Sequence, residues 1–412
     1  MQQFEIFVFI ICLAALFSYI NYRFIKWPPT VGIMVLSLVT STLLLVMTSL
    51  LPQRSEALIH IITSLDFHNL LMNGMLSFLL FAGSMHIDAN SLKKQGLPIR
   101  SLASFGVLIS TFIIGTLLYF LMAVFHLNIA YIYCLLFAAL ISPTDPIAVL
   151  AILKKAGIKK SLEIKIAGES LFNDGVAVVV FLTILEVAQT GIDKLSAGDI
   201  TILFVREAGG GLLYGLLLGY LGFFLLRSID KYEVEVLITI AIVMGGYLLA
   251  DKLHISGPLA MVVAGIVIGN KGRESGISDI TQEYLSKFWE LIDEILNALL
   301  FMLLGFEMLV LKIDKTIMIV SLLSIGIVLF ARWLSVAVPI IILRRKIDFE
   351  KNAIAILTWG GLRGGLSVAL ALSLPVEMHR DLFVTITYMV VIFSIIVQGL
   401  TIGKLYKKLS AK

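Results

Sequence analysis

The sequence predicts an all-α polytopic membrane protein, and three observations lead to that class. Of the 412 residues, 59% are hydrophobic and only 15% are charged, whereas soluble domains carry about 25% charged residues. The apolar residues form continuous runs of about 17–25 residues, the length that crosses a bilayer as a helix. A membrane barrel does not fit, because its strands alternate in polarity over about ten residues.

About thirteen such runs follow one another along the chain, and we expect each to form one transmembrane helix, the ninth being short. They lie near residues 4–20, 31–51, 69–88, 101–125, 129–152, 163–188, 203–227, 234–250, 256–270, 288–310, 317–343, 352–374 and 381–403. The first run is not a signal peptide, because no basic region precedes it and no small-residue cleavage site follows. Cys12 and Cys134 both lie in apolar runs and form neither a disulfide framework nor a metal-binding spacing.

Basic residues predict the orientation of these helices. An odd number of passes places the two termini on opposite sides of the membrane. The C-terminal tail KLYKKLSAK is basic, and cytoplasmic segments are enriched in lysine and arginine. We therefore expect the C-terminus in the cytoplasm and the N-terminus outside, an arrangement that puts most of the 32 basic residues on the cytoplasmic side. The chain is expected to form one multi-pass unit, 1–412, in the cell (inner) membrane, without a soluble C-terminal regulatory domain.

The fifth run contains ISPTDPIAVL at residues 141–150, where two prolines and a charge interrupt an apolar stretch. Pro143 and Pro146 each remove a backbone donor and open the helix. At membrane depth an opened helix is tolerated where it packs in protein or lines a cavity. One interpretation is a proline kink in which Asp145 caps the second half-helix. We favour a broken transporter helix that builds an ion site, because Thr144 and Asp145 supply oxygen ligands for a cation.

The sixth run contains GESLFNDG at residues 168–175. Its polar residues have the spacing i, i+1, i+4 and i+5, which places them in two adjacent rows on one side of a helix. These residues are Glu169, Ser170, Asn173 and Asp174. A capping motif is the alternative interpretation, but Asp174 lies about two turns beyond the expected helix start, too deep for a cap. We favour a polar face that looks into the protein interior.

Two arginines also lie at membrane depth, where a charge costs at least ~2.5–3.5 kcal/mol and indicates function by default. Arg332, in VLFARWLSVAVP, is alone near mid-span, too far from the interface for its side chain to reach water. It needs a carboxylate, and a bidentate pair with a glutamate is the expected form. Arg363 lies in WGGLRGGLSVAL, where the glycines indicate either a second irregular helix or close helix packing. The sequence supports both interpretations equally.

Five segments together resemble the monovalent cation–proton antiporters, in particular the NhaP-like sodium/proton antiporters. They are, in order, SPTDPIAV, GESLFNDGVAVVVF, ISGPLAMVVAGIVIGN, LFARWLSVAVP and WGGLRGGLSVALALSLP. The likeness covers residues 130–375 and, more loosely, the rest of the chain. It implies inverted repeats with two crossing discontinuous helices, the NhaA-like antiporter fold. It also implies a homodimer, with core helices about 69–188 and 288–403 that move against dimerisation helices about 4–51 and 203–270.

The resemblance also assigns roles to the residues at membrane depth. Asp174 resembles the carboxylate that binds sodium and protons in alternation. The ion-binding set that the resemblance implies is Asp174, Asp145, Ser170, Thr144 through its carbonyl, and Asn173. Glu169 resembles the acid that pairs with the buried arginine, here Arg332. Arg363 becomes the charge of the second crossing helix. The balance of buried charges further suggests Arg363, beside the ends of the half-helices, as a fixed partner of Asp145.

One departure from the family pattern concerns the third run. Many relatives carry an acid there, in a motif similar to LLFEGGL, whereas this chain reads LLFAGSM with Ala82 near that place. A role of that acid in ion coordination or access is therefore an open question for this chain.

These features predict a secondary antiporter that exchanges Na⁺, and also Li⁺, for H⁺ by alternating access with an electroneutral 1:1 stoichiometry. A K⁺/H⁺ antiporter is the alternative within transport. A non-transporting scaffold or receptor with structural buried charges is the alternative from another class, and it would tolerate Asp174→Asn. An enzyme is not expected, because the chain shows no zinc spacing, phosphate loop or nucleophile–base set. The expected partners are monovalent cations, protons and membrane lipid, with no cofactor and no nucleic acid.

Overall fold

The structure is a computed structural model that describes residues 3–50, 70–88, 95–191, 194–274, 278–309, 314–345, 347 and 349–410. Within these residues every regular element is a helix. Eight helices are long and apolar enough to cross a membrane by length and composition, and three shorter apolar helices accompany them. The predicted all-α polytopic class is therefore confirmed.

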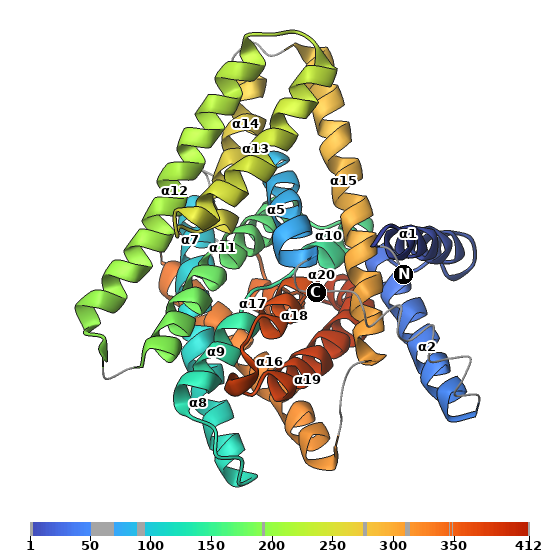
Figure 1. Ribbon diagram of the computed structural model, residues 1–412, viewed down its shortest axis with the longest axis vertical. Coiled ribbons are helices and arrows are strands. Elements are labelled where there is room, and N and C mark those ends of the chain that lie inside the picture. The colour runs from blue at the N-terminus through green and yellow to red at the C-terminus, as the bar shows by residue number, and fades with distance from the viewer. Residues whose placement is uncertain are drawn as a thin grey trace.

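The helices keep the order of the predicted runs (Figure 1). The first part of the chain forms α1 (Gln3–Ile20), α2 (Pro29–Leu50), α5 (Leu76–Met85), α7 (Gly96–Arg100), α8 (Gly106–Val124), α9 (Tyr131–Ile141), α10 (Ile147–Lys155) and α11 (Lys160–Thr190). The second part forms α12 (Ala197–Arg227), α13 (Tyr232–Lys252), α14 (Gly257–Glu274), α15 (Asp279–Phe306), α16 (Lys315–Leu343), α17 (Ala353–Trp359), α18 (Gly365–Leu372), α19 (Arg380–Phe393) and α20 (Gly399–Ser410).

Each predicted run coincides with one helix or with consecutive helical segments of one pass. Residues 51, 69 and 310, at the ends of predicted runs, lie outside the described residues. The largest difference is α15, which begins at Asp279 and not near residue 288. Its first three turns read DITQEYLSKFW, an amphipathic stretch that mean hydropathy misses because only one face is apolar. Ser278 starts this helix, since its hydroxyl accepts a hydrogen bond from the Thr281 N–H at 3.3 Å.

The helices α12, α13 and α14 lie together at one end of the molecule, where they pack beside α5 and the first half of α15 (Figure 1). Small residues allow α12 and α14 to approach closely. A Cβ atom on Gly215 would lie 2.6 Å from the backbone oxygen of Ala260, so the glycine is required by the packing of the two backbones. A second apolar core includes α8, α9, α11, α16 and α19, and a third includes α10, α17 and α20.

Two passes are interrupted near their middle, and the two interruptions contact each other. The first lies between the end of α9 and Ile147, and the second between Trp359 and Gly365. The Asp145 N–H, in the first break, donates to the Leu362 carbonyl of the second at 2.8 Å. Proline removes the helical bonds in the first break, and a glycine-rich loop replaces them in the second. The structure therefore combines both interpretations of the segment around Arg363, an irregular helix and close packing.

Candidate functional site

The break between α9 and α10 is stabilised by its own aspartate. The Asp145 carboxylate accepts a hydrogen bond from the Ile147 N–H at 2.9 Å, which caps the start of α10. At the other side of the break, Ser142 donates to the Ala138 carbonyl at 2.6 Å and contacts Thr111 at 3.2 Å. The structure therefore agrees with both interpretations of this segment: the helix is broken, and Asp145 caps its second half.

The polar face of α11 supports the opened backbone at Thr144. Ser170 donates to the Thr144 carbonyl, and Asn173 donates to the Thr144 hydroxyl at 2.8 Å. The side-chain oxygen of Asn173 also accepts from the Thr144 N–H at 3.3 Å. The backbone carbonyl and N–H of Thr144, which lack helical partners, and its hydroxyl are thereby satisfied within the protein, as membrane depth requires. These contacts bring together three members of the expected ion-binding set.

Asp174, on the same helix, lines a cavity of about 440 Å³ together with Asp145. Within the part of the chain that the structure describes, its carboxylate has no hydrogen-bond or ion-pair partner. The cavity also touches Lys154 near the end of α10 and Glu163 near the start of α11, at the lysine-rich side of the molecule. Asp174 therefore lies without a fixed partner among these residues in a cavity that extends to the lysine-rich side of the molecule.

Glu169 and Arg332 form a buried ion pair between α11 and α16. Both guanidinium Nη atoms donate to the carboxylate, Nη1 to Oε1 and Nη2 to Oε2, the latter at 3.1 Å. The arginine also donates to the Leu357 carbonyl at the end of α17, from Nε at 3.3 Å and from Nη2 at 3.1 Å. The two side chains are 2% and 7% exposed. Their charges cancel, and the pair ties α11 and α16 to the second broken pass.

Arg363 contacts backbone carbonyls and not a carboxylate. Its Nη1 donates to the carbonyls of Ser142 and Pro143, the latter at 2.8 Å. No hydrogen bond or ion pair joins it to Asp145 within the described residues, so Asp145 finds its partner in the half-helix end alone. The carbonyl end of α9 carries partial negative charge, which the guanidinium compensates. The carboxylate of Asp145 also lies against the second break, since a Cβ atom on Gly364 would overlap it.

Ala82 lies in α5 and is fully buried in the apolar core that α5 shares with α14. Its neighbours Leu79, Leu80 and Gly83 line the cavity of Asp174, whereas Ala82 is not among the lining residues. From the third run, apolar residues, Gly83 and His86 line the cavity, and none of them is an acid.

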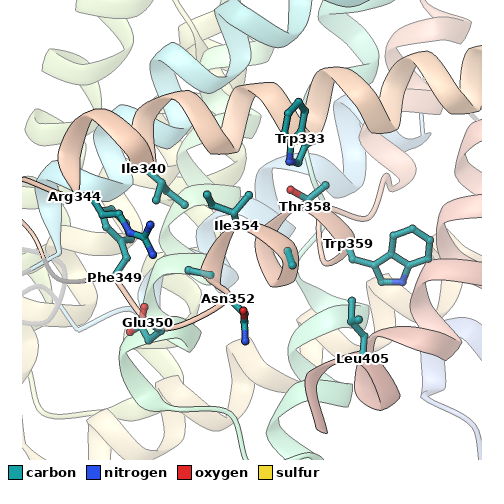
Figure 2. Close-up of a pocket in the computed structure, with 12 residues that line it drawn as sticks. Trp333, Ile340, Arg344, Phe349, Glu350, Asn352, Ile354, Thr358, Trp359 and Leu405 are labelled. Carbon is teal, nitrogen blue, oxygen red and sulfur yellow. The ribbon is translucent and has the colours of Figure 1, made fainter. Parts of the chain in front are cut away.

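A second cavity, of about 490 Å³, lies between α16, α17 and α20. Figure 2 shows Arg344, Phe349 and Glu350 at one end of it and Trp359 with Leu405 at the other. Its ionisable lining residues are Arg344 and Glu350, and Glu350 already pairs with Lys165 at 2.7 Å. This cavity offers no uncompensated acid, so the cavity of Asp174 is the candidate ion site.

Asp293 and Asn297 of α15 also line the cavity of Asp174, and neither was predicted as a site residue. Their spacing of i, i+4 inside the predicted run 288–310 could have indicated a polar site, because it places two polar side chains on one face of an apolar helix. Among the residues that the structure describes, no three His, Cys, Asp or Glu side chains group to hold a resident metal ion.

Two broken helices that meet in the membrane, with an uncompensated carboxylate in a cavity beside them, define the class of ion-coupled secondary transporters. The comparisons with known proteins give the particular family. Residues 11–408 match the family model described as "Sodium/hydrogen exchanger, transmembrane". The chain belongs to this family.

Curated relatives and solved structures agree with that assignment. The chain is 50% identical to the Na⁺/H⁺ antiporter NhaP of Pseudomonas aeruginosa, over 97% of this chain and 96% of the relative. It is 36% identical to the Na⁺/H⁺ antiporter NhaH of Halobacillus dabanensis, over 94% and 93% of the two chains. The sodium proton antiporter MjNhaP1 of Methanocaldococcus jannaschii has the same fold, with a TM-score of 0.77 over 100% of both chains at 20% identity.

Proposed function

We propose that the protein is a Na⁺/H⁺ antiporter in which Asp174 binds the cation and the proton in turn. Membership of the sodium/hydrogen exchanger family supports the exchange, and the relatives named above are Na⁺/H⁺ antiporters, which favours Na⁺ over K⁺ as the cation. One observation supports the choice of Asp174. Of the four acids that line the cavity, Asp145 caps α10, Glu163 pairs with a lysine and Asp293 interacts with the amide of Asn297, whereas Asp174 has no partner among the described residues.

Exchange follows from the charge of this carboxylate. A proton or a cation neutralises it, but not both together. The empty, charged site is costly to move through the apolar barrier, so the loaded forms are the ones that change sides. Each cycle then carries one Na⁺ in one direction and one H⁺ in the other.

The cation ligands that we propose are Asp174, Asp145 and the Thr144 carbonyl, with Ser170 and Asn173 as the groups that hold Thr144 in place. Carboxylate and carbonyl oxygens are the ligands that hard cations take. The hydrogen bonds of Ser170 and Asn173 to Thr144 support this division of roles, because they fix the carbonyl beside the cavity. Li⁺, which is also a hard cation, is expected to use the same oxygens.

We also propose the place and assembly of the protein. The lysine-rich side at the end of α10 faces the cytoplasm of the cell, so the cavity opens inward, the C-terminus is cytoplasmic and the N-terminus is outside. The helices α12, α13 and α14, with α1 and α2, form the dimerisation part of a homodimer. The helices that carry the two breaks form the moving core. The apolar side chains that α12 and α13 expose, such as Leu213, Leu217, Leu237 and Met244, support a lipid-facing or dimer-facing position.

The test is Asp174→Asn in everted vesicles, with dequenching of a pH-sensitive dye on addition of Na⁺, Li⁺ or K⁺. We expect the variant to fold and to lose the Na⁺ and Li⁺ responses, because an amide cannot alternate between a proton and a cation. Asp251→Asn, the same change at an exposed acid of α13, is the matched control and should respond as wild type. A wild-type response from Asp174→Asn would exclude the shared site and favour a non-transporting role for the buried charges.

A further inference from the structure

The cavity of Asp174 has a second polar wall that the proposed exchange does not use. This wall comes from α15 and α18, and we name Asp293, Asn297 and Ser367 the vestibule cluster. All three line the same cavity as Asp145 and Asp174. The two helices touch at this level, since a Cβ on Gly365 of α18 would overlap the side chain of Leu300 of α15.

Asn297 lines the cavity and has an unsatisfied side-chain oxygen. Its side-chain nitrogen donates to the Asp293 carbonyl at 2.7 Å, which fixes the orientation of the amide because an oxygen could not donate there. The oxygen at the other end of the amide is buried and has no hydrogen-bond partner, and the residue is 3% exposed. A buried acceptor of this kind is destabilising unless a ligand or water meets it.

Ser367 adds a second unsatisfied oxygen from the opposite helix. It is 1% exposed, and its hydroxyl has no hydrogen-bond partner. A hydroxyl has two acceptor lone pairs, so it can contribute to a cation shell. Asp293, one helical turn before Asn297, supplies the negative charge, and its carboxyl group interacts with the Asn297 amide. A carboxylate, an amide oxygen and a hydroxyl are together a ligand set for a hard cation.

We propose that the vestibule cluster is a second cation site, which holds a partly hydrated monovalent cation in the cavity before it reaches Asp174. This inference rests on the proposed function, because it names a further binding site on the path to the shared one. A carboxylate in a low-dielectric cavity raises the local cation concentration. The cluster therefore acts on the apparent affinity for Na⁺, whereas Asp174 is needed for exchange itself.

The experiment measures Na⁺-dependent proton flux in proteoliposomes over a range of Na⁺ concentrations. We expect Asp293→Asn, Asn297→Leu and Ser367→Ala each to raise the KM for Na⁺ by about three- to tenfold while the maximal rate is retained. Glu294→Gln is the matched control, because it removes the same charge from the next residue of α15, which is exposed and does not line the cavity. Its KM should stay at the wild-type value.

A binding measurement separates this site from the shared one. In purified Asp174→Asn protein, sodium NMR line broadening should still report saturable Na⁺ binding, and adding Asp293→Asn should abolish it. Active transport by Asp174→Asn would overturn the proposed function but not the vestibule site. An unchanged KM in the cluster variants would mean that water alone fills the site and would overturn the inference. So would an equal KM shift in Glu294→Gln, or a loss of maximal rate at constant KM.

Discussion

At the scale of single residues, the buried ionisable groups differ in whether they have a fixed partner. Glu169 and Arg332 neutralise each other in a bidentate pair, and Arg363 compensates the carbonyl end of α9. Removing a carbonyl or carboxylate partner from such a cation leaves a buried charge without compensation. Asp174 differs from these groups, because it has no fixed partner among the described residues.

The Glu169–Arg332 pair should matter for assembly more than for ion binding. We expect Glu169→Ala and Arg332→Ala each to lower the melting temperature, with a loss of ~3–5 kcal/mol, because each strands the other charge in the core. The double change should cost less than the sum of the single changes. Thermal unfolding of the purified proteins in a double-mutant cycle measures this coupling. Strict additivity would show that the two residues do not act as a pair.

The partner of a buried residue could be predicted from the sequence where the residue type alone requires a particular kind of partner. An arginine at mid-span requires a counter-charge, so the pairing of Arg332 with a glutamate followed from burial. The partner of Arg363 did not follow, because backbone carbonyls are present at every residue and leave no mark in the sequence. Asp293 was not recognised, because Glu290 and Glu294 beside it make the segment resemble an ordinary charged helix start.

At the scale of elements, most of the helices and their breaks could be predicted from two features of the sequence. These features are the length of the apolar runs and the positions of proline and glycine. The spans were recoverable because a bilayer sets a minimum apolar length. The breaks were recoverable because Pro143 and Pro146 exclude a continuous helix. The contact between the two breaks is a tertiary feature, and only the family resemblance predicted it. The early start of α15 was missed because its first turns are amphipathic.

One contact between elements joins the start of α11 to the connection between α16 and α17. Lys165 is 1% exposed and donates to Glu350 at 2.7 Å, and its ammonium also lies 5.0 Å from the centroid of the Phe349 ring. Burial acts to raise the pKa of Glu350, but hydrogen bonds from Lys165 and Ser161 outweigh it and hold the pKa below its ordinary value. The pair therefore stabilises this junction when Glu350 is ionised.

This pair should make stability depend on pH in acid solution. Because the folded pKa of Glu350 is below the unfolded value of about 4.3, its contribution is fully present above that value and is lost as pH falls through the folded pKa. We expect Glu350→Gln to lower the melting temperature at pH 7, and the difference from wild type to shrink below about pH 4. Glu377→Gln, at an exposed site, serves as the control. A difference that stays constant over this pH range would rule out the ion pair as its source.

At the scale of the whole molecule, the balance of buried charges determines whether transport moves net charge. If Asp174 is the one charge that is balanced in each half of the cycle, the loaded protein carries the same charge in both directions. A membrane potential acts on net charge alone, at ~2.3 kcal/mol per charge per 100 mV. Exchange by the whole molecule should then be insensitive to the potential at equilibrium.

Proteoliposomes with a potassium–valinomycin potential test this expectation. With the sodium and pH gradients set to balance, we expect no net sodium flux at either sign of the imposed potential. The same vesicles with an unbalanced sodium gradient provide the control, since they should show flux. A flux that reverses with the potential would show that a second acid titrates during transport, and Asp145 would be the first residue to examine.

The close approach of backbone at the two breaks has a consequence for how the sequence can evolve. A methyl group on Gly361 would overlap the Arg332 guanidinium, and one on Gly364 would overlap the Asp145 carboxylate. Gly245 and Gly326 have open space at the same position. In a library of all single substitutions grown under sodium stress, the first two sites should accept no other residue, while the last two accept alanine and serine. Mutational tolerance at a glycine of this protein then depends on the distance between its backbone and a buried charge, so glycines in the break are fixed while glycines in the helices α13 and α16 can vary.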